Sequence, residues 1–300
     1  MTYVSNEQLD DLRVTHSTIF HDVLKSTESW YKEVCTVVGS DSEENIYDWI
    51  EDSIVMLPWL GESDIRIIRE NAQRVTNVLH RAVAKLNRRK IKTDNLGIFQ
   101  AVALPMLAAA AEKAPDQRIA DILLSNAQGA KGLHFSTANG NTTNLALNAA
   151  NWETVRAAMR SRVNPRTGRP VSVGNSFELW VSPTNEGPAD RILTAEFGAV
   201  PGDSTGVSGQ NVNKGKAKVR VIEELGLNAN RWVVVAVGLP LKAFVFQELE
   251  STQLTIVDQP EAPSVLNDNM NLYVASRDFA VAPTLPELVY MSDPDGAMGA

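Results

Sequence analysis

The sequence predicts an α+β protein whose helices lie mostly in the first two thirds and whose strands lie mostly in the last third. Two long segments, residues 6–38 and 96–126, carry apolar residues at helical spacing. Six short runs rich in β-branched residues follow position 217. The composition, 44% hydrophobic and 21% charged, is that of an ordinary globular protein, and 300 residues suffice for one large domain or two modest ones.

The amino-terminal segment is predicted to form an amphipathic helical arm from Asn6 to about Val38. His16 and His21 are five positions apart, off the spacing that aligns side chains on one helix face, so we expect both to be solvated. Cys35 is the only cysteine and has no partner for an internal disulfide. We expect it to be a buried, small apolar residue.

Two oppositely charged segments follow each other. Residues 41–52 are acidic, whereas residues 61–95 are basic within a protein of net charge −8. From Val78 to Lys92 the alternation of apolar and polar residues predicts a long, mostly polar hairpin with little to bury in its own subunit. The basic candidates for contact with another subunit are Arg66, Arg69, Arg74, Arg81, Lys85, Arg88, Arg89, Lys90 and Lys92. Their candidate acidic partners are Glu43, Glu44, Asp48, Glu51 and Asp52.

These segments predict that copies of the chain complement one another. If the basic hairpin of one copy lies against the acidic stretch of the next, identical molecules join head to tail and close into rings. The alternative is a charged hairpin that is simply solvated. On the first interpretation, reversal of Arg88, Arg89 and Lys90 to Glu leaves the monomer folded and blocks assembly.

The longest helix is predicted after Asp94 and Asn95, which are good amino-terminal caps. Apolar residues cover one side of it from Leu96 to Lys113. We expect a kink at Pro105 or a break near Pro115, after which a helix continues to Asn126.

The rest of the chain alternates between helix and strand before it becomes mostly sheet. A passage rich in Gly and Asn occupies residues 129–144, and residues 198–215 contain five glycines and predict a long flexible loop. Helices are predicted for residues 152–162 and 186–197. Strands are predicted for residues 177–182, 218–222, 232–237, 243–249, 254–257, 272–282 and 288–291.

The sequence contains no motif that predicts catalysis, and we expect no catalytic residue, cofactor or metal site. The four histidines are scattered without metal-ligand spacing. Residues 209–216 superficially resemble a phosphate-binding loop, but Ala217 stands where a Ser or Thr is required. No nucleophile elbow is present.

The totals also exclude several locations and partners. A pI near 5.1 argues against a surface that wraps nucleic acid, because such binding relies on Lys and Arg. The amino terminus lacks a secretory pattern, so we expect the protein to stay where it is made. The most apolar runs, residues 101–111 and 232–241, are too short to span a bilayer, and no membrane partner is expected.

Several segments, in their order along the chain, resemble the Mu-like major head subunit family of tailed phages and, more broadly, capsid proteins of the Hong Kong 97 type. Residues 29–32 and 57–61 resemble the aromatic segments before the extended loop of that family, and residues 81–95 resemble its return strand. Residues 152–160, 168–170, 177–183, 242–247 and 286–290 resemble later elements. At residues 132–136, His134 precedes Phe135, unlike the family's order, so no role is transferred to His134.

The resemblance implies a Hong Kong 97 type capsid fold with an amino-terminal arm, an extended β-hairpin loop, a spine helix in a peripheral domain and an axial α/β domain. The implied divisions are residues 1–28 for the arm, 29–58 for part of the peripheral domain, 59–95 for the extended loop, 96–129 for the spine helix and peripheral domain, 130–238 for the axial domain, 239–282 for peripheral strands, and 283–300 for a return to the axial domain.

The function implied is that of a major capsid protein that assembles with itself into hexamers and pentamers of an icosahedral shell around double-stranded DNA. Scaffold, portal and decoration proteins are the implied partners, with DNA held on the inner face without sequence specificity. The location is the virion, after assembly in the host bacterial cytoplasm. The alternatives are an encapsulin-like nanocompartment shell protein and an α/β enzyme with an unrecognised site. Lys85, Lys90 and Lys92 are interpreted as ion-pairing residues in preference to covalent crosslinking sites.

Overall fold

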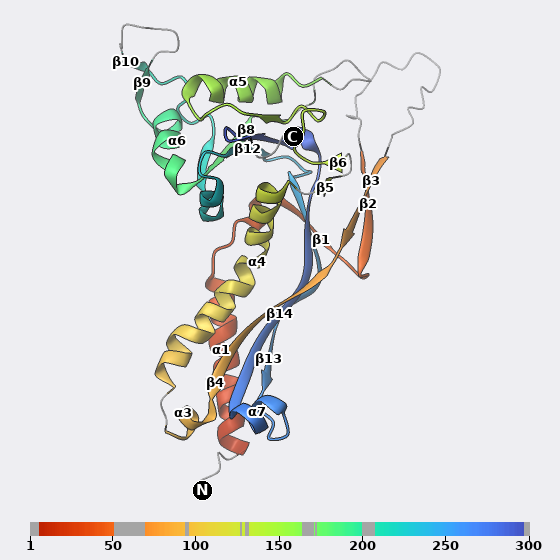
Figure 1. Ribbon diagram of the computed structural model, residues 1–300, viewed down its shortest axis with the longest axis vertical. Helices are drawn as coiled ribbons and strands as arrows, with labels where there is room; N and C mark the ends of the chain where they lie inside the picture. Colours follow the sequence, from red (N-terminus) through yellow and green to blue (C-terminus); the bar gives the residue numbers. More distant parts are fainter. Residues whose placement is uncertain are drawn as a thin grey trace.

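The computed structural model describes residues 6–50, 70–93, 96–126, 128–129, 132–163, 171, 173–199 and 208–296. Figure 1 shows a long lower body of strands and two long helices beneath a wider upper part. The helices are α1 (Asn6–Ser26), α2 (Tyr31–Val34), α3 (Arg88–Lys92), α4 (Leu104–Ser125), α5 (Ala149–Arg160), α6 (Glu186–Leu193) and α7 (Pro263–Asp268), with short turns η1 (Phe99–Ala103), η2 (Pro183–Asn185), η3 (Glu223–Asn228) and η4 (Pro286–Leu288). The strands are β1 (Cys35–Gly39), β2 (Glu44–Ile50), β3 (Glu70–Thr76), β4 (Val78–Asn87), β5 (Gln128–Gly129), β6 (Gly132–Leu133), β7 (Thr142–Thr143), β8 (Ser176–Val181), β9 (Phe197–Ala199), β10 (Ser208–Gln210), β11 (Lys218–Val221), β12 (Trp232–Val237), β13 (Phe244–Val257), β14 (Met270–Pro283) and β15 (Val289–Ser292).

The lower body is built on a four-stranded sheet with the order β1-β13-β14-β4. The long strands β13 and β14 are antiparallel, and β4 pairs antiparallel with β14 along all ten of its residues. Side chains alternate between the two faces, as the two-residue period of a strand requires. Along β14, for example, Tyr273, Ala275 and Arg277 are buried while their neighbours are partly exposed.

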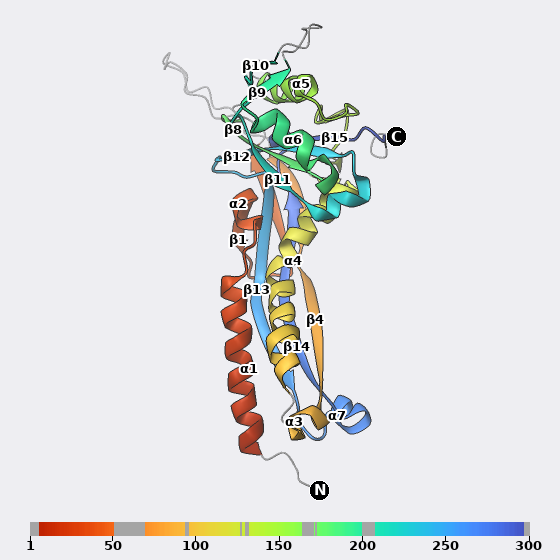
Figure 2. The ribbon, with the colours of Figure 1, turned by 90° about the vertical axis from the view of Figure 1, so that its left-hand side faces the viewer.

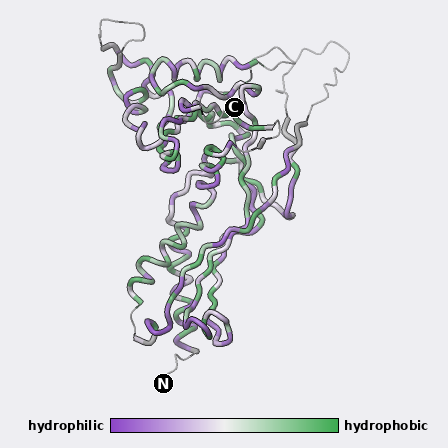
Figure 3. The backbone as a smooth tube through the Cα atoms, in the orientation of Figure 1, coloured by the Kyte–Doolittle hydropathy of each residue, from purple (hydrophilic) through white to green (hydrophobic). Residues whose placement is uncertain are grey.

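Helices α1 and α4 cover one face of this sheet, as Figure 2 shows. Phe20 of α1, Leu104 of α4, Leu86 of β4 and Tyr273 of β14 meet in a common core. Burial of a large apolar side chain contributes about 1.5–3 kcal/mol, so these contacts stabilise the arm against the sheet. Residues 96–111 contain no charged residue, and Figure 3 shows the hydrophobic character of this half of the helix.

The upper part contains a five-stranded sheet with the order β11-β8-β12-β15-β7. Strands β8 and β12 lie at its centre and are buried almost throughout, which explains their nearly continuous apolar sequences. Trp152 of α5, Trp180 of β8 and Trp232 of β12 are fully buried in the same core. Helix α6 and the end of α4 also contribute to this core, so α4 belongs to both cores.

Strands β2 and β3 form an antiparallel hairpin beside the lower sheet (Figure 1). Tyr47 of this hairpin donates a hydrogen bond to the side chain of Gln247 on β13 at 2.6 Å. Val75 packs with Val245 in a small separate core. The base of the hairpin is thereby anchored to the sheet, and the residues between its strands, 51–69, lie outside the described part of the chain.

The long helix was predicted in the right place, but its expected break near Pro115 is wrong. Helical backbone begins at Gly97, passes through the π-helical turn η1 and continues through Pro105 and Pro115 to Ser125. Proline lacks the N–H group that a helix interior uses, and the widened turn directly before Pro105 lets the helix continue there. Asn126 ends the helix in the left-handed conformation, with φ of 52°.

The predicted helix from Asn6 to Val38 is too long. Helix α1 ends at Ser26, where the Thr27 hydroxyl donates to the carbonyl of Val23 at 2.8 Å. After the short helix α2, Cys35 begins strand β1, which pairs in parallel with β13. The run of β-branched residues 36–38 favours this strand, and the tertiary pairing outweighs the helical periodicity. The predicted burial of Cys35 is confirmed.

The predicted polar hairpin over residues 78–92 is wrong as well. Residues 78–87 form the edge strand β4 of the lower sheet, and residues 88–92 form helix α3, capped by the Asn87 side chain on the N–H of Arg89. The alternation of apolar and polar residues, which suggested a polar hairpin, arises because one face of the strand packs against the rest of the subunit. Leu86 is buried on that face. This strand therefore contributes to the core of its own subunit.

Smaller differences concern the carboxyl-terminal half. The helix predicted for residues 186–197 ends at Leu193, and Phe197 starts the short strand β9, paired with β10. Residues 198–199 and 208–210 of the predicted loop are thus strand, while residues 200–207 lie outside the described residues. The strands predicted for residues 243–249 and 254–257 are one strand, β13, with irregular pairing near Glu250.

Candidate functional site

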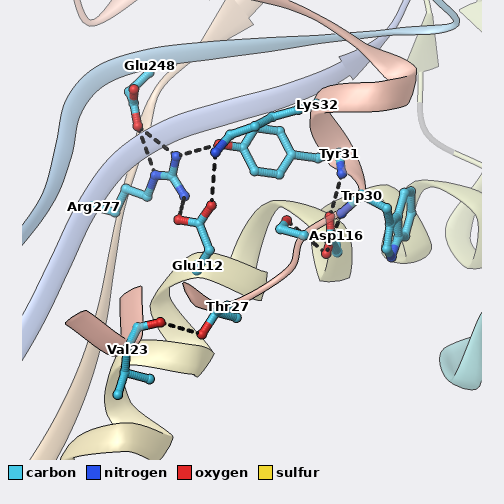
Figure 4. Close-up of polar contacts among 10 residues, drawn as sticks. Val23, Thr27, Trp30, Tyr31, Lys32, Glu112, Asp116, Glu248 and Arg277 are labelled. Carbon is cyan, nitrogen blue, oxygen red and sulfur yellow. Dashed lines mark hydrogen bonds and ion pairs between the residues drawn. The ribbon is translucent and has the colours of Figure 1, made fainter. Parts of the chain in front are cut away.

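The first candidate feature is the joint where the amino-terminal segment meets helix α4 (Figure 4). The carboxylate of Asp116 accepts hydrogen bonds from the Ser29 hydroxyl at 2.9 Å and from the backbone N–H groups of Trp30 and Tyr31 at 3.3 and 2.8 Å. The N–H groups of Trp30 and Tyr31 lie at the start of α2 and have no partner within the helix, so a carboxylate that accepts from them stabilises the helix. Burial raises the pKa of Asp116, and the hydrogen bonds partly oppose that rise. The joint thus depends on one buried carboxylate.

The second feature is Arg277, a buried cation on β14 next to this joint (Figure 4). Its guanidinium donates to Glu248 of β13 at 2.8–2.9 Å and to the hydroxyl of Tyr31 at 3.0 Å. Glu112 of α4 lies 3.6 Å from Arg277 and also pairs with Lys32 at 3.2 Å. Four segments of the chain are therefore connected through one network of charges.

A third feature links the amino-terminal segment to the upper sheet. Arg220 of β11 forms two hydrogen bonds, of 2.8 and 2.9 Å, with Glu178 of β8, and also pairs with Glu33 of α2. The Trp30 ring lies beneath the same guanidinium at 5.4 Å. Burial alone raises the pKa of Glu178, but the hydrogen bonds from Arg220 and Trp180 lower it below the ordinary value. Arg220 therefore holds α2 against the upper sheet.

The fourth feature is Arg231, which is fully buried at the start of β12. It pairs with Asp293 at 2.8 Å and donates to the backbone carbonyl of Leu123 at 2.9 Å. The last carbonyl groups of a helix lack partners within the helix, so Arg231 satisfies the end of α4. Together, the four features orient the upper sheet on the long helix and the lower body.

The predicted basic candidates are not gathered at one site. Arg74 pairs with Glu44 across the β2–β3 hairpin at 2.5 Å, and Arg88 donates to Asn271 at 2.9 Å and to the carbonyl of Asp258. The four exposed candidates, on β4 and α3, are Arg81, Lys85, Arg89 and Lys90. Arg66, Arg69 and the side chain of Lys92 lie outside the described residues.

Those predicted acidic candidates that fall within the described residues lie on or beside strand β2. Glu43 is exposed, and Glu44 is the partner of Arg74 within the same chain. The side chain of Asp48, together with Glu51 and Asp52, lies outside the described residues. Arg74 and Glu44 are thus paired within one subunit, whereas the prediction was a contact between two subunits.

The histidine expectations were half right. His21 is exposed, as predicted, whereas His16 is completely buried. Its Nδ1 atom lies 2.8 Å from the hydroxyl of Tyr273 and its Nε2 atom 3.1 Å from the amide of Gln100. Burial lowers the pKa of His16. The helix presents this residue to the sheet because its apolar neighbours occupy the same face.

The described residues contain no cluster of three or more His, Cys, Asp or Glu side chains placed to hold a metal ion. Within the same part of the chain, no helix is both long and apolar enough to cross a bilayer.

Sequence reasoning missed the buried charges Asp116, Arg231 and Arg277. Each of them pairs with residues far away in the sequence, such as Arg231 with Asp293. The sequence does contain one signal of a buried charge, which is a single Arg next to or inside an apolar strand, as at Arg231 and Arg277. A charge in such a place is rarely buried without a partner, which is a reason to search for one.

The chain is an elongated α+β subunit whose parts are joined by buried ion pairs. The sequence profile of the phage capsid protein family matches residues 82–296, and the chain belongs to this family. The profile of the Mu-like prophage major head subunit matches residues 9–133. Both agree with the resemblance found in the sequence and with a structural role rather than a catalytic one.

A curated relative aligns with part of the chain. The Mu-like prophage FluMu major head subunit of Haemophilus influenzae is 27% identical over 116 residues, which are 39% of this chain and 38% of that protein. The chain therefore aligns with less than half of that relative's length.

Two solved structures share the fold over almost the whole chain. The procapsid of bacteriophage JBD30 matches with a TM-score of 0.59 and 19% identity, covering 97% of this chain and 76% of that one. The virus-like particle from Pyrococcus furiosus matches with a TM-score of 0.53 and 12% identity, covering 93% and 98%. The predicted Hong Kong 97 type fold is confirmed.

Proposed function

We propose that this chain is the major head subunit of a tailed phage or prophage and assembles with itself into hexamers and pentamers of an icosahedral shell around double-stranded DNA. The observation that carries the proposal is the match of the phage capsid protein family over residues 82–296. The fold shared with the JBD30 procapsid supports it.

The parts of the fold have natural places in such a shell. We assign the lower body, with β13, β14 and the long helix, to the peripheral domain and the five-stranded sheet to the axial domain. The β2–β3 hairpin begins the extended loop, and α1 is the amino-terminal arm. A shell subunit must keep one shape in contact with its neighbours. The hydrogen bonds of Asp116 and the ion pairs of Arg220, Arg231 and Arg277 support that shape.

The exposed cations of β4 and α3 are the proposed contacts with a neighbouring subunit. Because Arg88 contacts Asn271 and Asp258 of its own chain, its reversal to Glu would damage the subunit as well as any contact. Arg89 and Lys90 are the better targets, since both are exposed. Exposed ion pairs contribute about 0–1 kcal/mol each, so the stability of a shell must come from many such contacts repeated between subunits.

The remaining partners follow from the same proposal. A scaffold, a portal and a decoration protein would assist assembly in the host bacterial cytoplasm, and the product would be the virion. DNA would lie against the inner face without sequence specificity, as the net charge of −8 does not suit tight phosphate binding.

Sedimentation velocity of the purified protein, expressed alone and together with its neighbouring genes, tests the proposal. Particles of many subunits are expected under at least one condition. A monomer or dimer under both conditions would contradict a shell function.

An encapsulin-like nanocompartment shell is the second candidate, because the fold also occurs in a particle that is described as virus-like, that from Pyrococcus furiosus, over 93% of this chain. Nuclease treatment of the particles separates the two candidates. Protected DNA inside them supports the phage head, and DNA-free particles that carry a protein cargo support the nanocompartment.

A further inference from the structure

The outer surface of helix α1 combines acidic residues with an exposed apolar side chain, and one cation, Lys25, lies at its carboxyl-terminal end. Glu7, Asp11, Val14, Thr18 and Asp22 are three or four residues apart and exposed, so they share the helix face that points away from the core. Val14, near the middle of this face, is 68% exposed. At 1.5 Å per residue, this acidic face extends over about 22 Å.

The exposed side of strand β4 has the opposite charge. Leu79, Arg81, Val83 and Lys85 alternate along it, with Leu79 44% and Val83 51% exposed. Arg89 and Lys90 of α3 extend the row, and residues 78–92 contain no carboxylate. At about 3.3 Å per residue, the row on β4 alone extends over about 20 Å. This basic face is therefore about as long as the acidic face of α1.

The strand beside the basic face places one carboxylate next to it, Asp278 opposite Leu79, and none directly opposite the two cations. Across the β4–β14 pairing, Arg81 stands opposite Ser276 and Lys85 stands opposite Leu272. The central position, Val83, stands opposite Val274. The face thus has an apolar centre between two cations, and the acidic face has Val14 between Asp11 and Asp22. The two patterns are opposite in charge, and each has an exposed valine between its charged residues.

The two faces lie on opposite flanks of the lower body. Helix α1 packs over β13 and α4, whereas β4 is the edge strand on the other side of the sheet, as Figure 2 shows. One chain cannot bring its own two faces together. Complementary patches on opposite flanks of one molecule generate head-to-tail contacts, which close into a ring when the rotation between copies permits it.

We propose that the acidic face of α1, centred on Val14, docks on the basic face of β4 and α3, centred on Val83, of a second copy of this chain. This inference rests on the proposed shell function and names the acidic partner of the cations. It favours α1 over the residues 43–52 that the sequence suggested, because Glu44 is already engaged by Arg74 of its own hairpin.

Crosslinking of assembled particles tests the contact directly. Cys35 is buried, so new surface cysteines react without interference from it. In a Val14→Cys/Val83→Cys double variant, a short bismaleimide reagent is expected to give a ladder of covalent multimers on a denaturing gel. The matched control pairs Leu227→Cys, at an exposed apolar position of the upper part, with Val83→Cys, and is expected to give no ladder.

Charge exchange supplies a second test. Asp11→Lys with Asp22→Lys, and separately Arg81→Glu with Lys85→Glu, should each lower the particle yield about tenfold, and the quadruple variant should recover most of it. Glu186→Lys with Asp190→Lys changes the charge equally on exposed α6 positions and should leave the yield unchanged. Circular dichroism of the dissociated subunits checks that every variant folds.

The outcomes separate this contact from the shell function. Normal particles that give no Val14 to Val83 ladder overturn the contact and leave the shell function standing. The contact is equally overturned if Val14→Cys crosslinks to a scaffold protein, if only charge reversal at residues 43–52 blocks assembly, or if the control pair ladders equally. Failure of the unmodified protein to assemble contradicts both proposals.

Discussion

The guanidinium of Arg231 and the carboxylate of Asp293 form a buried ion pair, with Nη2 and Oδ2 2.8 Å apart. The same arginine binds the carbonyl of Leu123 at the end of helix α4. A single residue therefore connects the long helix, the central strand β12 and the segment after β15. Since α4 also belongs to the lower core, this pair helps to fix the upper part on the lower body.

Removal of the cation from this pair should be severely destabilising. Arg231→Met leaves Asp293 buried without its partner and should lower the free energy of unfolding by about 3–5 kcal/mol. Replacement of both partners, Arg231→Met with Asp293→Leu, should recover much of the loss because no charge is then left unpaired. Urea denaturation followed by tryptophan fluorescence measures both. A single variant that loses under about 1 kcal/mol would show that Arg231 has no such role.

The cap at Asp116 makes a second prediction. Asp116→Ala removes three hydrogen bonds at the start of α2 and should cost about 2 kcal/mol, at the upper end for a helix cap. Asp116→Asn keeps an oxygen acceptor and should cost less than half as much. Thermal melting of the two variants side by side gives the comparison. Equal melting temperatures for Asn and Ala would contradict a capping role.

The pair formed by His16 and Tyr273 makes a third prediction. Tyr273→Phe removes the hydroxyl that lies 2.8 Å from His16 and leaves a buried ring nitrogen without its partner, at a cost of about 1–3 kcal/mol. Tyr290→Phe is the matched control, since its hydroxyl makes only a 3.4 Å contact with a carbonyl. Chemical denaturation should show a clearly larger loss for Tyr273→Phe. The reverse order would mean that the buried contact contributes little.

The stability of the subunit should decline in mild acid because of His134. Burial, together with the nearby charge of Arg162, lowers the pKa of His134 to about 4. The folded chain therefore binds this proton less readily than the unfolded chain, whose pKa is near 6.5. The contribution is complete above pH 6.5 and is lost as the pH falls toward 4, with a total of about 3 kcal/mol.

Denaturation curves across this window test the pH dependence. His134→Met should make the decline between pH 6.5 and 4 shallower, with buried His16 contributing to what remains, and the exposed His21→Met should leave it unchanged. A His134→Met protein that loses stability as steeply as the unmodified one would place the acid sensitivity elsewhere.

The fold class and the positions of most elements were predictable from local patterns. The apolar stripe of residues 96–126 predicted a helix, and the β-branched runs after residue 217 predicted strands. The structure has α4, β12 and β14 in these places. The errors occur where tertiary pairing decides. Residues 35–38 continue a helical pattern, yet they pair with β13, which is more than 200 positions away. Strand β4 looked like part of a free hairpin because the strand it pairs with, β14, begins more than 180 positions later in the sequence.

The candidate site was predictable only in part, for a related reason. Exposed charges such as Lys85 and Lys90 stand out in a sequence because they cluster. Buried charges such as Arg277 occur singly, and their partners are set by packing, as with Glu248 on the adjacent strand and Glu112 on the helix. The outer face of α1 became visible only once the structure had divided its residues into buried and exposed sets.

The most direct test of the shell function is negative-stain electron microscopy of the purified protein, expressed alone and with its neighbouring genes. Closed shells, tubes or rings of sixfold units are expected under at least one condition. A field of uniform monomers or dimers under both conditions would contradict the shell function.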